Sequence, residues 1–220
     1  MQAVRRRPIA AWIAATLYRS ASTLSTSTPI CSPPSNTSRS GSSSSSGSTS
    51  PSNEPRAQIR HKPSTPLPDG PRPLRIACSH LHSNVNLSQI VRAASCSGVT
   101  QILACGVGNK LKAEIAREGA DHVRLEVRNS LNSSLQAWRA EGFRIVALEQ
   151  AVSSKSIYDY RFDRNTVLVI GNEKSGLTQD ILNLADDILE IPIYGMPYSH
   201  NVSAATAIAI YEYCKQYPRG

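Results

Sequence analysis

The sequence is poor in aromatic residues and has no long apolar run. Only 5% of its 220 residues are Phe, Trp or Tyr, and no stretch reaches the ~18 consecutive apolar residues of a membrane-spanning helix. Its five cysteines include no Cys-x-x-Cys pair, although small disulfide-stapled domains and zinc sites depend on grouped cysteines. These absences argue against an integral membrane protein, a disulfide-stapled domain and a structural zinc site.

Acidic residues are absent from the first 53 positions, and this uneven distribution accounts for the net charge of +8. Residues 1–73 carry nine basic and two acidic side chains, whereas residues 74–220 carry 15 basic and 14 acidic ones. Attraction to a polyanion depends on clustered charge, not on the average over a chain. The net charge alone therefore does not identify a nucleic-acid-binding domain.

Residues 1–73 have the composition of a disordered tail. Between Ser20 and Asn53, 16 of 34 residues are serine, and residues 63–73 contain five prolines. Such a segment buries too little apolar area to offset its ordering entropy. The first 19 residues contain arginines and no acid, so a transit peptide, a secretory signal and a tail without targeting value all stay open. We expect a cytoplasmic protein, or a mitochondrial or plastid one if the source is eukaryotic.

From residue 74 to 220 the sequence alternates short apolar runs with segments of helical periodicity. Strands are expected at 74–78, 101–105, 122–127, 144–148, 166–170 and 188–191, and helices at 87–96, 110–117, 130–141, 178–184 and 201–216. This alternation predicts one α/β domain with a buried, mainly parallel sheet. The last helix is apolar nearly all round in its first half, so the sheet and a second subunit are expected to cover it; a central helix of a monomer is the alternative.

Three polar segments follow predicted strands. They are Asn86-Leu-Ser-Gln-Ile-Val-Arg92, Gly171-Asn-Glu173-Lys-Ser-Gly176, and Ser199-His-Asn201 after Ile191-Pro. Each alone is a weak signal, because glycines can simply form a turn and Asn or Ser can cap a helix. Ligand sites of parallel sheets gather at the carboxyl ends of strands, so the three together predict a functional site.

In this order and spacing, the segments resemble the three motifs of the SpoU (TrmH-type) RNA ribose 2′-O-methyltransferases of the SPOUT class. The resemblance covers about residues 74–216. It implies a six-stranded, mainly parallel sheet with a C-terminal trefoil knot, a homodimer with composite sites, and S-adenosylmethionine as methyl donor without a metal. The substrate implied is a ribose 2′-hydroxyl of tRNA or rRNA. A catalytically weak RNA-binding homologue and a base-methylating SPOUT enzyme are the alternatives.

The same resemblance assigns the site residues. The catalytic residues it implies are Arg92, Asn86, Glu173, Ser199 and Asn201. The donor-binding residues it implies are Gly171, Ile191, Met196, His200, Asn201 and Val202. An arginine pKa of ~12.5 or higher excludes a role as ordinary base, so Arg92 is expected to hold a phosphate and stabilise the developing alkoxide. The sequence departs from the family motifs at Ser88, where glycine is usual, and at His200, where leucine is usual.

A set of basic residues lies between the first and second motifs. They are Lys110, Lys112, Arg117, Arg124 and Arg128. They form either a modest RNA-facing patch or a solvated surface, and the sequence does not choose between the two.

Overall fold

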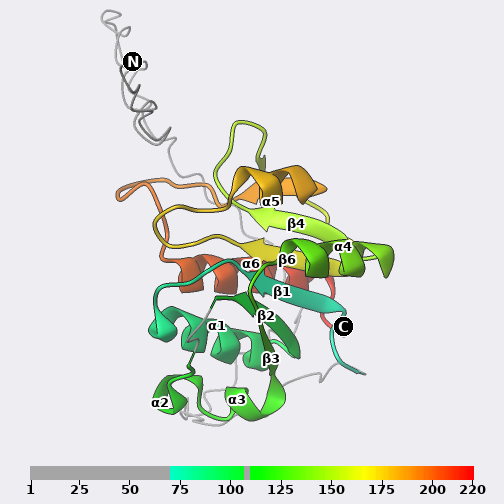
Figure 1. Cartoon of the computed structure of the whole chain (residues 1–220). Coiled ribbons are helices and arrows are strands. Elements are labelled where there is room, and N and C mark those ends of the chain that lie inside the picture. Colours follow the sequence, from blue (N-terminus) through cyan, green and yellow to red (C-terminus); the bar gives the residue numbers. More distant parts are fainter. Residues whose placement is uncertain (1–69, 107–109) are drawn as a thin grey trace, which may run out of the picture. The chain divides into compact units, whose positions relative to one another are not determined.

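The computed structural model describes residues 70–106 and 110–220, and the predictions for residues 1–69 lie outside this part of the chain (Figure 1). The strands are β1 (Leu74–Cys78), β2 (Gln101–Cys105), β3 (Arg124–Arg128), β4 (Arg144–Leu148), β5 (Lys155–Ser156), β6 (Thr166–Ile170) and β7 (Asp187–Glu190). The helices are α1 (Asn84–Cys96), α2 (Ala113–Ala116), α3 (Gly119–His122), α4 (Asn132–Ala140), α5 (Gln179–Leu184) and α6 (Val202–Gln216).

The strands form one sheet in the order β3-β2-β1-β6-β4-β7-β5, and every neighbouring pair is parallel. The prediction of an α/β fold with a mainly parallel sheet is therefore confirmed. The seventh strand, β5, was not predicted, because two residues are too few to produce a pattern. The trefoil knot implied by the resemblance stays a prediction.

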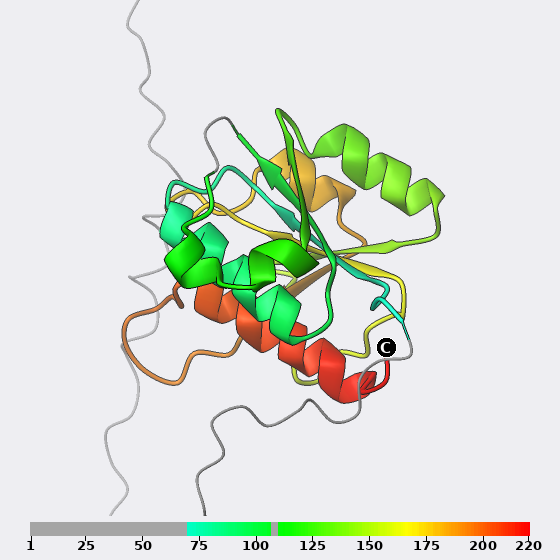
Figure 2. The ribbon, with the colours of Figure 1, turned by 90° about the horizontal axis from the view of Figure 1, so that it is seen from below.

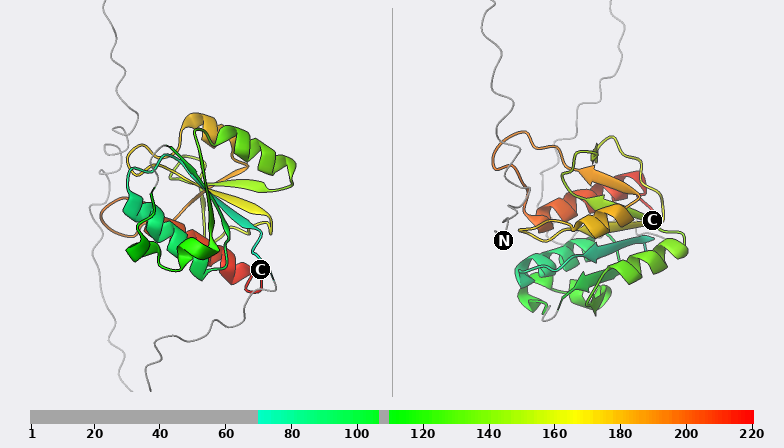
Figure 3. Two further views of the ribbon diagram at one scale, coloured as in Figure 1. Left: turned by 60° about the horizontal axis from the view of Figure 1, so that its bottom comes forward. Right: turned by 45° about the horizontal axis from the view of Figure 1, so that its top comes forward.

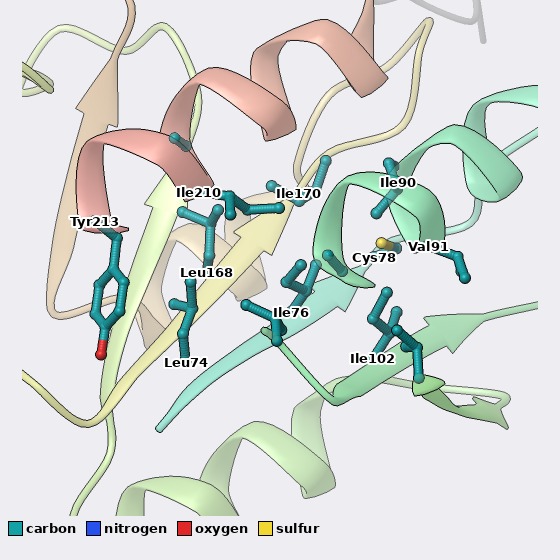
Figure 4. Close-up of a cluster of buried hydrophobic side chains, with 14 of the residues drawn as sticks. Leu74, Ile76, Cys78, Ile90, Val91, Ile102, Leu168, Ile170, Ile210 and Tyr213 are labelled. Atoms are coloured by element: carbon teal, nitrogen blue, oxygen red, sulfur yellow. The ribbon is translucent and has the colours of Figure 1, made fainter. Parts of the chain in front are cut away.

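The sheet lies between two layers of helices, with α1 and α6 on one face and α4 and α5 on the other (Figures 2 and 3). Alternate residues of each central strand point to opposite faces, as the twofold repeat of a strand requires. Ile76, Leu168 and Ile170 pack toward α1 and α6 (Figure 4), whereas Ala77 and Val169 pack toward α4 and α5. Both faces are thus buried, which explains why the strands are apolar throughout.

Two predicted helices begin or end elsewhere. The first was expected at Leu87 with Asn86 as a possible cap, but α1 begins at Asn84 and Ser83 is its N-cap, accepting from Asn86 N at 3.3 Å. The segment 110–117 was expected to be one helix ending at Gly119. Instead, helix α2 ends before Arg117, whose φ is 49°, and Gly119 begins a separate helix, α3. Periodicity does not reveal such a left-handed residue when it is not glycine.

The folded domain also includes Arg72, which the sequence analysis assigned to the tail. This side chain is 8% exposed. Its Nε donates to Ser97 O, and its terminal nitrogens donate to Tyr217 O and, at 3.0 Å, to Pro218 O. Arg72 therefore ties the start of the domain to its C-terminal end.

Helix α6 is only half covered in this chain. Thr206, Ala209, Ile210 and Tyr213 are buried against the core, while Tyr211 remains 54% exposed. Alanines at 204, 205 and 207 are exposed or half-exposed. Among the described helices, none is long and apolar enough to cross a membrane.

Candidate functional site

The three polar segments meet at the carboxyl edge of the sheet, where the loops after β1, β6 and β7 come together at the left of Figure 1. Strands β1 and β6 are neighbours, with Cys78 opposite Ile170, so the loops that follow them leave the sheet side by side. Asn172 Nδ2 donates to His80 O and links these two loops directly. Parallel topology thus assembles residues that are far apart in the sequence.

A directed chain of hydrogen bonds joins the three segments. Ser203 N donates to Asn201 Oδ1 at 2.9 Å, Asn201 Nδ2 donates to Asn86 Oδ1 at 3.2 Å, and Asn86 Nδ2 donates to Glu173 Oε1 at 2.9 Å. Each amide accepts on one side and donates on the other, so the chain ends on a carboxylate and every member is oriented by the next. We call Asn86, Glu173 and Asn201 the motif cluster.

Glu173 caps helix α1 from a different part of the chain. Helix α1 has no acidic residue in its own first turn, but the Glu173 carboxylate accepts from His82 N at 3.0 Å and from Ser83 N at 3.1 Å. Partial burial raises the pKa of Glu173, but the hydrogen bonds from His82, Asn86 and Ser83 outweigh it and hold the pKa below its ordinary value. The carboxylate is thus kept ionised at the positive end of a helix dipole.

The loop after β6 has its shape for steric reasons. Asn172 and Gly176 exchange two backbone hydrogen bonds of 3.0 Å. A Cβ at Gly171 would lie 2.8 Å from the Gly176 carbonyl carbon, and Gly176 has φ 65°. Glu149, just after β4, braces the loop by accepting from Leu177 N at 2.8 Å. The two glycines are therefore explained by the turn itself, and the functional signal of this motif comes from Glu173.

Two predicted catalytic residues lie outside the motif cluster. Arg92 is exposed, two turns beyond Asn86 on α1, and its side chain has no hydrogen bond or ion pair with the described residues. Ser199 is exposed in the loop before α6 and likewise makes no recorded polar contact within the described chain. The fold presents both side chains to solvent, and none of residues 70–106 and 110–220 makes a polar contact with them.

Apart from Gly171, which follows β6, the predicted donor-binding residues lie between the end of β7 and the start of α6. Ile191 buries its side chain in the core at 7% exposure, whereas Met196 is 73% exposed and His200 is exposed. No backbone–backbone hydrogen bond is recorded for residues 192–200. This loop therefore offers amide and carbonyl groups that a ligand can use. Val202 packs partly against the core at the start of α6.

Sequence reasoning missed several supporting residues. Ser83 caps α1, Gln89 accepts from the Ser203 hydroxyl at 2.6 Å and joins α1 to α6, and Glu149 braces the β6 loop. A signal existed only for Glu149, which directly follows a predicted strand like the recognised motifs. In the described part of the chain no three His, Cys, Asp or Glu side chains are grouped as potential metal ligands.

Comparison with known proteins gives a consistent result. The model of the SpoU rRNA Methylase family matches residues 73–211. A tRNA (guanosine(18)-2′-O)-methyltransferase of Escherichia coli (strain K12) is 29% identical over 145 residues, which cover 65% of this chain and 63% of that protein. The enzyme of the same name from Aquifex aeolicus (strain VF5) is 32% identical over 146 residues, covering 65% and 69%.

The fold agrees with a solved structure. A TrmH/SpoU tRNA modifying enzyme of A. aeolicus superposes with a TM-score of 0.65 at 30% identity, covering 69% of this chain and 79% of that one. The present chain thus spans less than two thirds of the E. coli relative but most of the A. aeolicus fold. With the three motifs joined at one edge of a parallel sheet, these matches lead to one assignment: the chain belongs to the SpoU rRNA Methylase family.

Proposed function

We propose that this chain is an enzyme that methylates a ribose 2′-hydroxyl of RNA with S-adenosylmethionine. The observation that carries the proposal is the motif cluster, because it joins the three family motifs by direct hydrogen bonds at the edge where parallel sheets bind ligands. Relatives named tRNA (guanosine(18)-2′-O)-methyltransferases favour tRNA as the substrate over rRNA.

The loop between β7 and α6 fits the methyl donor. Its unpaired backbone groups suit the adenine and ribose edges, and Gly171, Met196, His200 and Asn201 surround the same edge of the sheet. S-adenosylmethionine, when bound, supplies a methyl group already activated on a sulfonium. The carboxylate of Glu173 has no ion pair with any described residue, and it gives the site a negative charge that favours a cationic ligand.

The protein must then align and activate a weak nucleophile. A ribose hydroxyl has a pKa far above 7, so it needs alignment with the methyl group and stabilisation of its developing negative charge. Arg92 is suited to that stabilisation or to holding an adjacent phosphate. The motif cluster fixes the loops that present the hydroxyl-binding groups, and Ser199 lies within the third motif beside it.

We further propose a homodimer with composite sites. Two observations support it: Arg92 makes no hydrogen bond or ion pair with the motif cluster of its own chain, and α6 leaves Tyr211 and several alanines uncovered among the described residues. A second copy packed on this face would cover the apolar surface and bring an arginine of one subunit to the cluster of the other.

Subunit mixing tests the composite site. Arg92→Ala and Glu173→Gln are each expected to be inactive, but an equal mixture that exchanges subunits should regain about a quarter of the wild-type activity, since half of the dimers carry one intact site. Light scattering checks the dimer itself. A monomer, or a mixture that stays inactive after verified exchange, would contradict the composite site.

Donor binding and methyl transfer test the function itself. Calorimetry with S-adenosylmethionine and transfer of a tritiated methyl group to total RNA are expected to give binding and labelled 2′-O-methylribose. Binding of RNA without transfer would instead indicate a catalytically weak RNA-binding homologue. Label on a base would indicate a base methyltransferase.

A further inference from the structure

The stretch of sequence that contains α1 has no acidic residue. The sequence has no Asp or Glu between Asp69 and Glu114. Within this interval, Arg72 is occupied by three carbonyl groups and Arg75 pairs with Glu141 at 2.6 Å. The basic side chains left over are exposed and have no ion pair among the described residues; they are Arg92, Lys110 and Lys112.

The two lysines are held against α1 by their own backbone. Lys110 N donates to Asn84 Oδ1 at 3.3 Å, and Lys112 N donates to Ser88 Oγ at 2.8 Å. The Ser88 hydroxyl in turn donates to Asn84 O at 2.6 Å, and Ser88 is 0% exposed. The buried Ser88 hydroxyl therefore connects α1 to the backbone of Lys112.

The segment that begins at Lys110 continues along α1 as far as Arg92. Ser88 and Arg92 are four residues apart, a rise of ~6 Å on the same side of the helix. A Cβ at Gly119 would lie 3.3 Å from Arg92 Cα. The chain from Lys110 to Gly119 thus follows one side of α1, with its lysines at the Asn84 end and its glycine at Arg92.

The other basic residues singled out from the sequence differ from these two lysines. Arg124 and Arg128 both pair with Glu126, at 2.9 and 3.1 Å, so their charge is partly neutralised. The acids that accompany the lysines, Glu114 and Glu118, begin only where α2 begins and lie on the far side of Lys112 in the sequence. Arg117 is exposed and has no ion pair among the described residues, but it lies between Glu114 and Glu118 in the sequence. Of the candidate RNA-facing patch, only its first two members precede the first acid of this segment.

We propose that Lys110 and Lys112 form a phosphate-binding site for the RNA substrate beside Arg92, and that Ser88 is the positioning residue of this site. The inference rests on the proposed function and adds to it a second point of contact with the RNA backbone. Exposed ammonium groups without an ion pair, next to an arginine, can bind RNA phosphates. The counterions that these phosphates release contribute to the affinity. The departure from glycine at position 88 acquires a physical role, because glycine has no hydroxyl to accept from Lys112 N.

Salt-dependent binding of an unmodified tRNA transcript to the full-length chain tests the site. Lys112→Gln is expected to weaken binding about 3- to 10-fold and to reduce the slope of log affinity against log salt by about 0.7–0.9, the value of one phosphate contact. Arg161→Gln removes one exposed positive charge that precedes β6 at the other edge of the sheet, and it is the matched control with an unchanged slope.

Ser88→Ala tests the positioning role. It should reproduce the flatter slope and raise KM for RNA, with kcat and donor binding unchanged, and the double variant with Lys112→Gln should bind no worse than Lys112→Gln alone. Ser97→Ala is the control for loss of a hydroxyl at the C-cap of the same helix, because the Ser97 hydroxyl donates to Ala93 O and Ala94 O and bonds to no lysine among the described residues. Equal melting temperatures of the two serine variants remove folding as an explanation.

Two results separate this site from the proposed function. Slopes of Lys112→Gln and Ser88→Ala equal to that of Arg161→Gln, in a chain that methylates RNA, would overturn the phosphate site alone. Flattened slopes in a chain that binds RNA without methylating it would support the phosphate site and overturn the proposed function.

Discussion

The carboxyl and amino ends of the sheet each carry a carboxylate with three hydrogen-bond donors, but the donors differ. At the amino end, Asp187 accepts from Arg144 Nε at 2.7 Å, from Lys155 Nζ at 2.7 Å and from Tyr160 OH at 2.8 Å. Its side chain is 6% exposed. Burial raises the pKa of Asp187, but the bonds from Lys155, Arg144 and Tyr160 outweigh it and hold the pKa below its ordinary value.

At the carboxyl end, Glu173 receives only neutral donors, two backbone amides and the side chain of Asn86. Asp187 is thus neutralised by two cations and closed off from solvent, whereas Glu173 is exposed and keeps its negative charge. A neutralised carboxylate can only join elements of the fold. An un-neutralised one still acts on a cation that arrives from outside. The comparison indicates which end of the sheet is built for stability and which for a ligand.

The largest effect is expected from Arg92→Ala. It should lower kcat about 10²–10³-fold, the usual cost of removing one group that stabilises developing charge. Donor affinity and melting temperature should stay unchanged, because Arg92 is exposed and unpaired within its own chain. Methyl-transfer assays measure kcat, titration calorimetry measures the donor affinity, and thermal unfolding measures the melting temperature. Wild-type activity of this variant would remove the catalytic assignment.

Glu173→Gln is expected to follow. A glutamine oxygen cannot serve all three donors that the carboxylate serves, so the motif cluster should shift, and misplacement of a site by about 1 Å can cost about 100-fold in rate. Stability should change little because Glu173 is exposed. A variant that loses stability while keeping its rate would reverse the proposed difference between the two ends.

Asp187→Asn is expected to give the opposite pattern. It should lower the free energy of unfolding by about 2 kcal/mol, or the melting temperature by roughly 4–8 °C, with kcat unchanged. Because the folded-state pKa of Asp187 is depressed, its contribution is present above the unfolded pKa of ~3.9 and is lost as pH falls through the folded value. Thermal unfolding from pH 7 to pH 3 should therefore show the two proteins converging. A difference in melting temperature that stays constant from pH 7 to pH 3 would show that the ionised Asp187 carboxylate is not its cause.

The smallest effect is expected from deleting residues 1–57, which lie outside the described part of the chain. Methyl transfer at physiological salt should stay within about twofold, with a slightly weaker salt dependence because basic residues are lost. Parallel imaging of tagged full-length and deleted chains tests whether this segment is a targeting sequence. A large loss of activity in the purified deleted chain would show that part of the site lies within residues 1–57 and not at either end of the sheet.

The central strands could be predicted because they are buried on both faces. Thr166–Ile170 and Arg144–Leu148 match their predictions residue for residue, since only apolar side chains fit there. The edge strand Lys155–Ser156 is held by two pairings with β7 and by long-range contacts of Lys155, which local pattern does not contain. The prediction of one helix over residues 110–117 failed at Arg117, because its positive φ leaves no signal in the local sequence pattern.

The site divides in the same way. Asn86, Glu173 and Asn201 were identified by their order and spacing, and they do meet. Of their supports, Ser83 caps α1 through a bond from Asn86 N, whereas Glu149 accepts from Leu177 N, 28 residues further along the chain. The position of Glu149 after a predicted strand signalled a role, but its partner could not be read from the sequence. Side-chain identity predicted the chemistry, but the orientation of each group depends on tertiary contacts.

The Arg72 clamp has a consequence for how this domain can be joined to others. Because Arg72 binds the carbonyls of Tyr217 and Pro218, the chain enters and leaves the domain at one place, at the amino ends of the strands. The motif cluster lies at the opposite edge. A module joined directly before Gly70 or after Gly220 therefore emerges behind the domain, where a tag or carrier protein can be attached without covering the motif cluster.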